Sequence, residues 1–474
     1  MVNYPRILKK TNMKFVAGMG KAFKSMLPTP FTIALLLTAV TFILALTLTS
    51  SESSGFDRVF ELMGFWEQGL WNSPLLVFAI QMMLMLVLGH ALALTRPVDL
   101  LMSYATRFCT TTAKAAAIVT LLTILVSLFN WGLGLIFGAI LARKVGEFAA
   151  TTNRNLNYSL IGAAGYSGLM VWHGGISGSA PIKVAESGHL TELMTGSMSE
   201  SQLSQLPDAI TFSDTIFSSM NLCAICLLVL ILPLFMYWVG KRSKKTTALP
   251  EISHDSPALE VKLDGAEKLD GSQLFSSFFG VVIVGYAIYT AVTAFETKGF
   301  GFINPNFINL LLLGLCLGLH RNIRQFLKAI DKAIGGSSGI LIQFPLYFGI
   351  MGIMNSSGLV QVFSDFFVSI STLTTFPIFT FFSAGIVNVF VPSGGGQWGV
   401  QGPIIVKAAT DLGVSLPKAI MALSYGDQLT NMLQPFWALP LLGITGLKAK
   451  NILPYTVALM GIGILIFISV LLIF

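Results

Sequence analysis

Long apolar runs separated by short polar loops dominate the chain. A helix needs about 20 apolar residues to cross a bilayer. Runs of this kind are predicted at 31–49, 75–95, 212–239, 273–295, 336–354 and 453–474, with a shorter one at 302–319. The pattern predicts an all-α polytopic membrane protein.

Four further apolar segments are interrupted near their centres by glycine, serine or asparagine. Segments 156–186 and 417–446 are predicted to cross as broken helices, and segments 115–142 and 376–410 to form re-entrant hairpins. Lipid cannot satisfy free backbone N–H and C=O groups, so irregular backbone at membrane depth must line a cavity in the protein. Broken helices in both halves of a chain indicate the binding site of a transporter.

Composition supports the membrane assignment and excludes several other classes. The 474 residues are 54% hydrophobic and 11% charged, with a mean hydropathy of +0.76. Soluble domains carry about 25% charged residues. The net charge of +7 therefore reflects topology, and no nucleic-acid partner is expected. The four cysteines lie in or beside apolar segments without metal-ligand spacing, so neither a metal nor an organic cofactor is expected.

The basic residues predict the orientation. With the N-terminus in the cytoplasm, all but five of the 29 Lys and Arg residues fall inside, as the positive-inside rule requires. The exceptions are Arg58, Lys183, Lys298, Lys407 and Lys418. The predicted organisation is an N-terminal interfacial segment (1–30), a first membrane repeat (31–240), a cytoplasmic linker (241–272), a connecting transmembrane helix (273–299) and a second membrane repeat (300–474).

Corresponding residues suggest that the two halves are repeats. Asn130 and Asn388 are 258 residues apart and lie in the two hairpins, while Tyr166 and Tyr425 are 259 apart and lie in the two broken spans. The additional crossing at 273–295 would invert the second half relative to the first. The sequence therefore predicts two inverted repeats, an architecture of alternating-access carriers.

The breaks supply the candidate binding chemistry. A helix that begins at a break presents free N–H groups and a positive dipole end to an anion. The breaks contain no Lys or Arg, which favours a small monocarboxylate over a more highly charged substrate. The candidate substrate- and ion-binding residues are Asn130, Trp131, Gly132, His173, Gly174, Gly175, Ser177, Ser179, Asn388, Ser393, Gly394, Gly395, Gly396, Gln397, Trp398, Gln401, Asp427, Gln428, Asn431 and Gln434.

Asp427 is the carboxylate that this topology places deepest in a broken span. Intramembrane ionisable groups are usually functional, so Asp427 is a candidate carrier or organiser of a coupling ion, either a proton or sodium. The competing interpretation is a structural aspartate bonded to neighbouring amides. His173 is equally open to a structural or a titrating role.

The chain resembles the bacterial short-chain fatty acid uptake permeases. The resemblance covers nearly the whole chain and is carried by NWGLGLIFGA (130–139), GGISGSAP (174–181), VPSGGGQWGVQGP (391–403) and YGDQLTNMLQPFWALP (425–440). It implies secondary uptake of acids such as acetoacetate or butyrate across the cytoplasmic (inner) membrane. It also implies scaffold and transport domains with elevator motion, and a homodimer. His173 and Gln397 stand where the family pattern would have glycine and histidine.

Three alternatives stay open. The first is an ion antiporter of the wider ion-transporter superfamily, for which several intramembrane carboxylates would be expected. The second is a carrier of other organic anions. The third, a membrane enzyme using His173 and Asp427, is disfavoured because the sequence shows no metal-ligand spacing or nucleophile elbow, so no catalytic residue is assigned.

Overall fold

The computed structural model describes residues 28–53, 55–195, 198–243, 265–298 and 302–474, and within them every regular element is helical. Seven helical segments of this part are long and apolar enough to cross a membrane. This confirms an all-α polytopic architecture. Most of the interfacial segment 1–30 and of the linker 241–272 lies outside the described residues.

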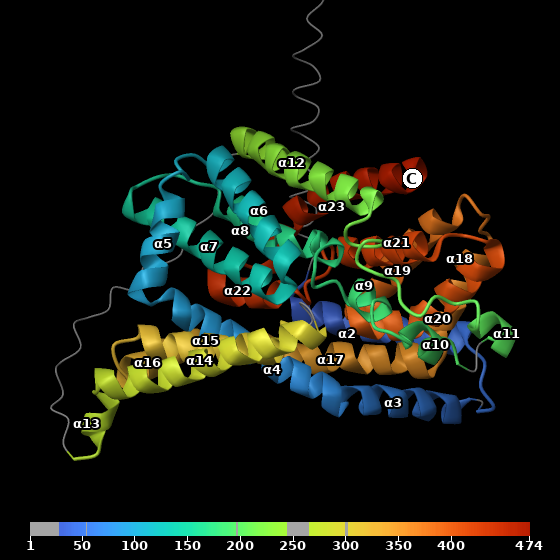
Figure 1. Cartoon of the computed structure of the whole chain (residues 1–474), viewed down its shortest axis with the longest axis horizontal. Helices are drawn as coiled ribbons and strands as arrows, with labels where there is room; N and C mark the ends of the chain where they lie inside the picture. Colours follow the sequence, from blue (N-terminus) through green and yellow to red (C-terminus); the bar gives the residue numbers. More distant parts are fainter. Residues whose placement is uncertain (1–27, 54, 196–197, 244–264, 299–301) are drawn as a thin grey trace, which may run out of the picture.

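One group of helices forms a long band along one side of the molecule (Figure 1). Within it α17 packs on α2 and α3, and α4 packs on α15 and α16. Glycines allow the closest approach, since a Cβ on Gly69 of α3 would collide with the α17 backbone at Phe348. The band consists of α2 (Pro30–Leu48), α3 (Phe56–Leu70), α4 (Ser73–Ala93), α14 (Gln273–Lys298), α15 (Pro305–Leu319), α16 (Ile323–Ile334), η4 (Gly335–Ser337) and α17 (Ser338–Ser356).

The second group contains the interrupted segments. Two helical pairs turn at Asn130 and at 391–393, and two helices are broken at 167–178 and 431–437. The members are α5 (Arg96–Thr106), α6 (Thr112–Phe129), α7 (Trp131–Thr151), α8 (Tyr158–Tyr166), η1 (Ser167–Met170), η2 (Trp172–Gly174), α9 (Ser179–Val184), α12 (Ser219–Arg242), α18 (Leu359–Ser369), α19 (Phe376–Phe390), α20 (Gly394–Leu412), α21 (Leu416–Thr430), α22 (Ala438–Thr445) and α23 (Ala449–Ile473). The loop between α9 and α12 carries α10 (His189–Met194) and α11 (Glu200–Leu203), and α13 (Glu267–Asp270) precedes α14.

The halves share one order of elements. Each begins with an apolar helix, followed by an amphipathic helix, a longer helix and a short helix. A helical pair, a broken helix and a long final helix complete the series. The first series runs from α2 to α12 and the second from α15 to α23, with α14 between them. This order agrees with the predicted repeat, while the inversion of one half stays a prediction.

Several predicted boundaries were wrong. The span predicted at 212–239 begins at Ser219, because residues 212–218 form turns that end at the N-cap Ser218. The first helical pair does not end at 142 but continues to Thr151, where Arg143 and Lys144 form ion pairs with Glu147. Four shorter helices (α3, α5, α16 and α18) lie in regions assigned to loops or left unassigned.

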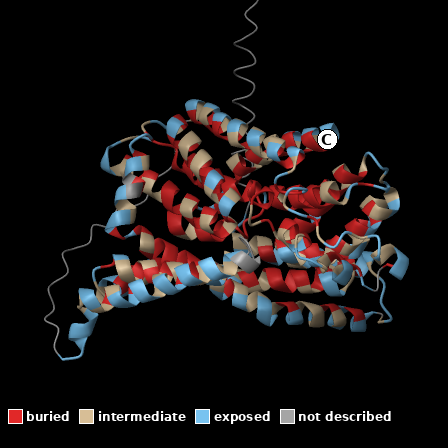
Figure 2. Cartoon of the chain, viewed as in Figure 1, coloured by how far each residue is buried: buried red, intermediate tan, exposed pale blue. Residues whose placement is uncertain are grey.

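Burial varies widely among the helices. Figure 2 shows buried residues concentrated around α7, α8 and α21, and exposed residues along α14. Every residue from Ala419 to Leu429 is buried, whereas only 11% of the most apolar window of α14 is. Because α14 is apolar, its exposed surface suits contact with lipid. The break region, by contrast, is enclosed by protein.

Candidate functional site

The tips of the helical pairs differ in how many N–H groups they leave free. Asn130 caps α7 by accepting from the Leu133 N–H at 2.9 Å, and the Ser177 hydroxyl accepts from the Trp131 N–H at 3.0 Å. Ser393 caps α20 by accepting from the Gly396 N–H at 3.2 Å. No acceptor among the described residues is recorded for the N–H groups of Gly394 and Gly395. The α20 tip therefore presents two free donors at a helix N-terminus.

His173 and Asp427 face one another where the two broken helices meet. His173 Nε2 and Asp427 Oδ2 are 3.3 Å apart, and both side chains are almost completely buried. The contact lacks hydrogen-bond geometry, and neither atom has another hydrogen-bond partner within the described residues. Two unpartnered polar atoms in a buried site are costly unless they bind something.

The surroundings fix the imidazole in place. The backbone N–H of His173 donates to Gln428 Oε1 at 2.8 Å, and the backbone N–H of Ser179 donates to the ring nitrogen His173 Nδ1 at 3.2 Å. A Cβ built on Gly394 would lie 2.7 Å from His173 Nε2. The α20 tip therefore touches the ring, which places the free donors of this tip beside the His173–Asp427 pair.

A cluster of amides joins α19 to the second break. Asn388 Nδ2 donates to the Asp427 carbonyl at 2.7 Å and lies 3.1 Å from Asn431 Oδ1. Gln434 Nε2 lies 3.2 Å from the same Asn431 oxygen. The amide oxygens of Asn388 and Gln434 have no partner in the described part of the chain. They are available to a cation or to water.

Sequence reasoning missed Asn221, which ties the first break to α12. Its Nδ2 donates to the Gly174 carbonyl at 2.9 Å, and its Oδ1 accepts from the Tyr425 hydroxyl at 3.0 Å. A lone asparagine in the apolar run 212–239 was the available signal. Gly175 has a packing role, since a Cβ there would collide with the Leu128 backbone. Gly132 lies against Met85, where a Cβ would be 3.0 Å from the sulfur.

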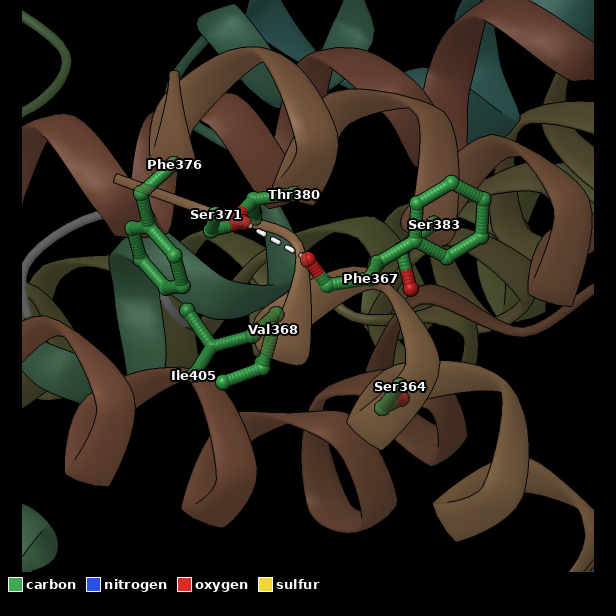
Figure 3. Close-up of a pocket in the computed structure, with 8 residues that line it drawn as sticks. All are labelled: Ser364, Phe367, Val368, Ser371, Phe376, Thr380, Ser383 and Ile405. Atoms are coloured by element: carbon green, nitrogen blue, oxygen red, sulfur yellow. Dashed lines mark hydrogen bonds between the residues drawn. The ribbon is translucent and has the colours of Figure 1, made fainter. Parts of the chain in front are cut away.

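Gln397 and Gln401 point into the interior of the α19–α20 pair. Gln397 Nε2 donates to Gln401 Oε1 at 2.8 Å, and Gln401 Nε2 donates to the Ser364 and Ser383 hydroxyls at 3.0 and 3.2 Å. Both serines line a cavity of about 10 Å³, shown in Figure 3, which is roughly the size of one water molecule. The structure therefore gives these two glutamines hydrogen bonds within the helical pair and to α18, and none to the His173–Asp427 pair.

Trp398 contacts the loop between α9 and α12. Its indole N–H donates to His189 Nε2 at 3.0 Å, which fixes α10 on α20. Burial lowers the pKa of His189 from its usual value of 6.5, and the nearby Lys183 lowers it further, while Glu186 and Glu192 act in the opposite direction. A neutral imidazole is required for this contact, because the protonated ring has no acceptor nitrogen.

We expect acid to release α10 from α20. The lowered pKa means that the contact contributes stability above about pH 6.5 and loses it as the pH falls through the lowered value. After correction for the slower intrinsic exchange in acid, the protection factors of residues 188–195 and 198–210 should therefore fall between pH 7 and pH 5. His189→Gln retains an acceptor for Trp398 without titrating, so its exchange should respond less to pH. An identical acid response in wild type and H189Q would contradict this role.

A row of aromatic rings extends from His173 toward the band. The rings of His173 and Trp172 have centroids 3.6 Å apart, Trp172 and Trp131 5.7 Å, and Trp131 and Trp437 5.1 Å. Phe78 of α4 continues the row at 6.0 Å from Trp437. Trp131 is half-buried, and the buried Trp172 indole nitrogen has no acceptor among the described residues. The row forms an apolar wall that includes the unpartnered Trp172 N–H.

No group of three or more potential metal ligands among His, Cys, Asp and Glu occurs in the ranges that the structure describes. The candidate site combines free backbone N–H groups, a histidine that faces a carboxylate, neutral amide oxygens and aromatic rings. These groups suit binding of a small anion with an apolar portion.

The fold and this centre belong to a polytopic helical membrane protein of the transporter class. Residues 13–474 match the family model described as short chain fatty acid transporter. The chain belongs to this family, which confirms the resemblance seen in the sequence.

Two curated relatives agree. A protein of Escherichia coli (strain K12) is 34% identical over 94% of this chain and 96% of its own length, and one of Haemophilus influenzae (strain ATCC 51907) is 37% identical over 90% and 92%. Both names assign the relatives provisionally to short-chain fatty acid transport. The relatives are thus named as transporters, not as enzymes.

Two solved structures align along most of the chain at low similarity. Neisseria gonorrhoeae MtrF, described as belonging to a class of antimetabolite efflux pumps, has a TM-score of 0.44 and 14% identity, covering 98% of this chain and 97% of that one. The Alcanivorax borkumensis YdaH transporter has a TM-score of 0.41 and 13% identity, covering 93% and 98%. No residue role is transferred at this distance.

Proposed function

We propose that the protein is a secondary active transporter that imports short-chain fatty acids, small monocarboxylates such as acetoacetate or butyrate, across the bacterial cytoplasmic membrane. The observation that carries the proposal is the α20 tip, where the unpartnered N–H groups of Gly394 and Gly395 adjoin the buried His173 ring. A helix N-terminus binds a carboxylate without a basic side chain. A single negative charge suits a site whose breaks supply no Lys or Arg.

The aromatic row accounts for the acyl portion of the substrate. It starts at Trp172 beside His173 and continues through Trp131 to Trp437. An acid whose head group binds the α20 tip would lay its short apolar chain along these rings. The free Trp172 N–H would suit a keto oxygen such as that of acetoacetate.

Alternating access would move the second group of helices, acting as transport domain, against the band, acting as scaffold, in an elevator-like manner within a homodimer. Uptake would be coupled to a proton or sodium ion.

The direct test is counterflow in proteoliposomes. Liposomes preloaded with butyrate should accumulate labelled acetate, butyrate and acetoacetate transiently, and citrate should not compete. Counterflow of dicarboxylates or inorganic cations with none of the monocarboxylates would instead support another organic-anion carrier or an antiporter. The antiporter is less favoured because, within the described residues, Asp427 is the one buried carboxylate.

If the two halves are inverted repeats and the N-terminus lies in the cytoplasm, the tips of the two helical pairs should open to opposite faces of the membrane. Single cysteines at Gly132 and Gly395, in a background without the native cysteines, should react with impermeant thiol reagents from opposite faces. The nearest atoms to a Cβ at Gly132 belong to the flexible Met85 side chain, and a Cβ at Gly395 meets nothing within 4 Å. Gly134 is unsuitable, because its Cβ would collide with Ser127. Labelling of both sites from one face under every condition would contradict the inversion.

A further inference from the structure

We propose that the coupling ion is a proton and that it is carried by the Asp427 carboxyl, which faces the His173 ring. The inference rests on the proposed function and names the ion that this centre takes. Its starting observation is the 3.3 Å approach of His173 Nε2 to Asp427 Oδ2, with both atoms buried and otherwise unpartnered in the described structure.

The backbone of Ser179 determines which nitrogen of His173 bears hydrogen. The Ser179 N–H donates to His173 Nδ1 at 3.2 Å, so Nδ1 acts as acceptor and carries no hydrogen. In the neutral ring the hydrogen is therefore on Nε2, which faces the carboxylate. A second proton on the ring would have to sit on Nδ1 against the Ser179 N–H. An added proton consequently goes to Asp427.

Substrate and proton binding are linked by charge. Without the proton, the pair carries one negative charge next to the α20 tip, because Gly394 contacts the His173 ring. Like charges repel strongly where water is excluded, so this charge opposes a carboxylate at the Gly394 and Gly395 N–H groups. Protonation of Asp427 removes that charge. The acid anion and one proton then bind together and leave together, and the sum of their charges is zero.

Other ionisable side chains do not replace this pair. Of the elements that pack against η2, α21 supplies Asp427 and Tyr425, whose hydroxyl is bonded to Asn221. Lys183 of α9 pairs with Glu186 at the surface. The remaining charged groups lie near the helix ends that are remote from the tips and breaks. They are Lys114 of α6, Lys418 of α21, and Lys407 and Asp411 of α20.

The test compares exchange with accumulation in the same proteoliposomes. Wild type should concentrate labelled butyrate under an inward proton gradient without sodium, and a membrane potential alone should not drive uptake. Asp427→Asn should lose accumulation while retaining counterflow exchange. His173→Gln should shift the pH profile of accumulation. Asp411→Asn, a matched change at the far end of α20, should behave as wild type. Accumulation driven by sodium at zero pH gradient, or undiminished in D427N, would overturn the proposal.

A spectroscopic readout separates this inference from the proposed function. Infrared difference spectra of the purified protein between two pH values should contain a protonated-carboxyl band that is lost in D427N and kept in D411N. That band requires no substrate, so it can be present even if no tested acid is transported, in which case the substrate assignment fails and the proton site stands. If the band is identical in D427N and wild type, Asp427 is not the proton site.

Discussion

Gly395→Val should abolish most butyrate uptake while leaving the protein folded. Gly395 has no positive φ, and a Cβ there meets nothing within 4 Å, so the fold accepts a larger residue. Helical side chains lean toward the N-terminus, so the valine would cover the space in front of the free N–H groups. Losing hydrogen bonds to a charged group costs about 1.5–3 kcal/mol, which corresponds to a roughly 10- to 100-fold loss of uptake.

Gly399→Val is the matched control, because it lies one turn further along the same exposed side of α20 and its Cβ also meets nothing within 4 Å. Both variants replace a helical glycine by valine, so they change helix propensity in the same direction and their thermal denaturation midpoints should agree. Butyrate uptake should fall in G395V only. Equal loss in both variants, or normal uptake by G395V, would remove the α20 tip from the binding site.

The break positions were predictable because membrane burial constrains the sequence so strongly. Glycine, serine and asparagine within apolar runs predicted breaks at 173–181 and 391–398, and the structure has interruptions that overlap them, at 167–178 and 391–393. The pattern alone also indicated that Asp427, Gln428 and Asn431 share one broken helix. Their contacts with His173 and Leu169 of the other half could not be predicted, because pairing between segments some 260 residues apart depends on tertiary packing.

Sequence reasoning also missed helices whose apolar stripe is narrow. In α16 the buried residues Phe326, Ala329 and Ala333 recur at helical spacing among four charged residues, so mean hydropathy assigned the segment to a loop. The directions of Gln397, Gln401 and Trp398 were likewise inaccessible. They lie close together near the start of α20, yet their hydrogen bonds reach Ser383, Ser364 and His189 of α10. A position near a tip does not specify which way a side chain points.

Trp131→Leu should change which acids are transported. Trp131 is the half-buried centre of the aromatic row, between Trp172 and Trp437. A leucine removes much of the ring volume and opens space beyond the end of a four-carbon chain. Each methylene accommodated in an apolar pocket contributes about 1–3 kcal/mol to discrimination. We expect the ratio of hexanoate to butyrate uptake to rise roughly tenfold or more.

Competition against labelled butyrate by unlabelled acids of increasing length measures this effect. The inhibition constant for hexanoate should fall in W131L, while that for acetate should change little, because a two-carbon acid would occupy only the head-group region beside Gly394 and His173. Trp238→Leu is the control, since Trp238 lies on α12 under Arg242 and away from the row. If W131L weakens all acids equally, Trp131 supports the fold of the α6–α7 tip, and the acyl chain must bind elsewhere.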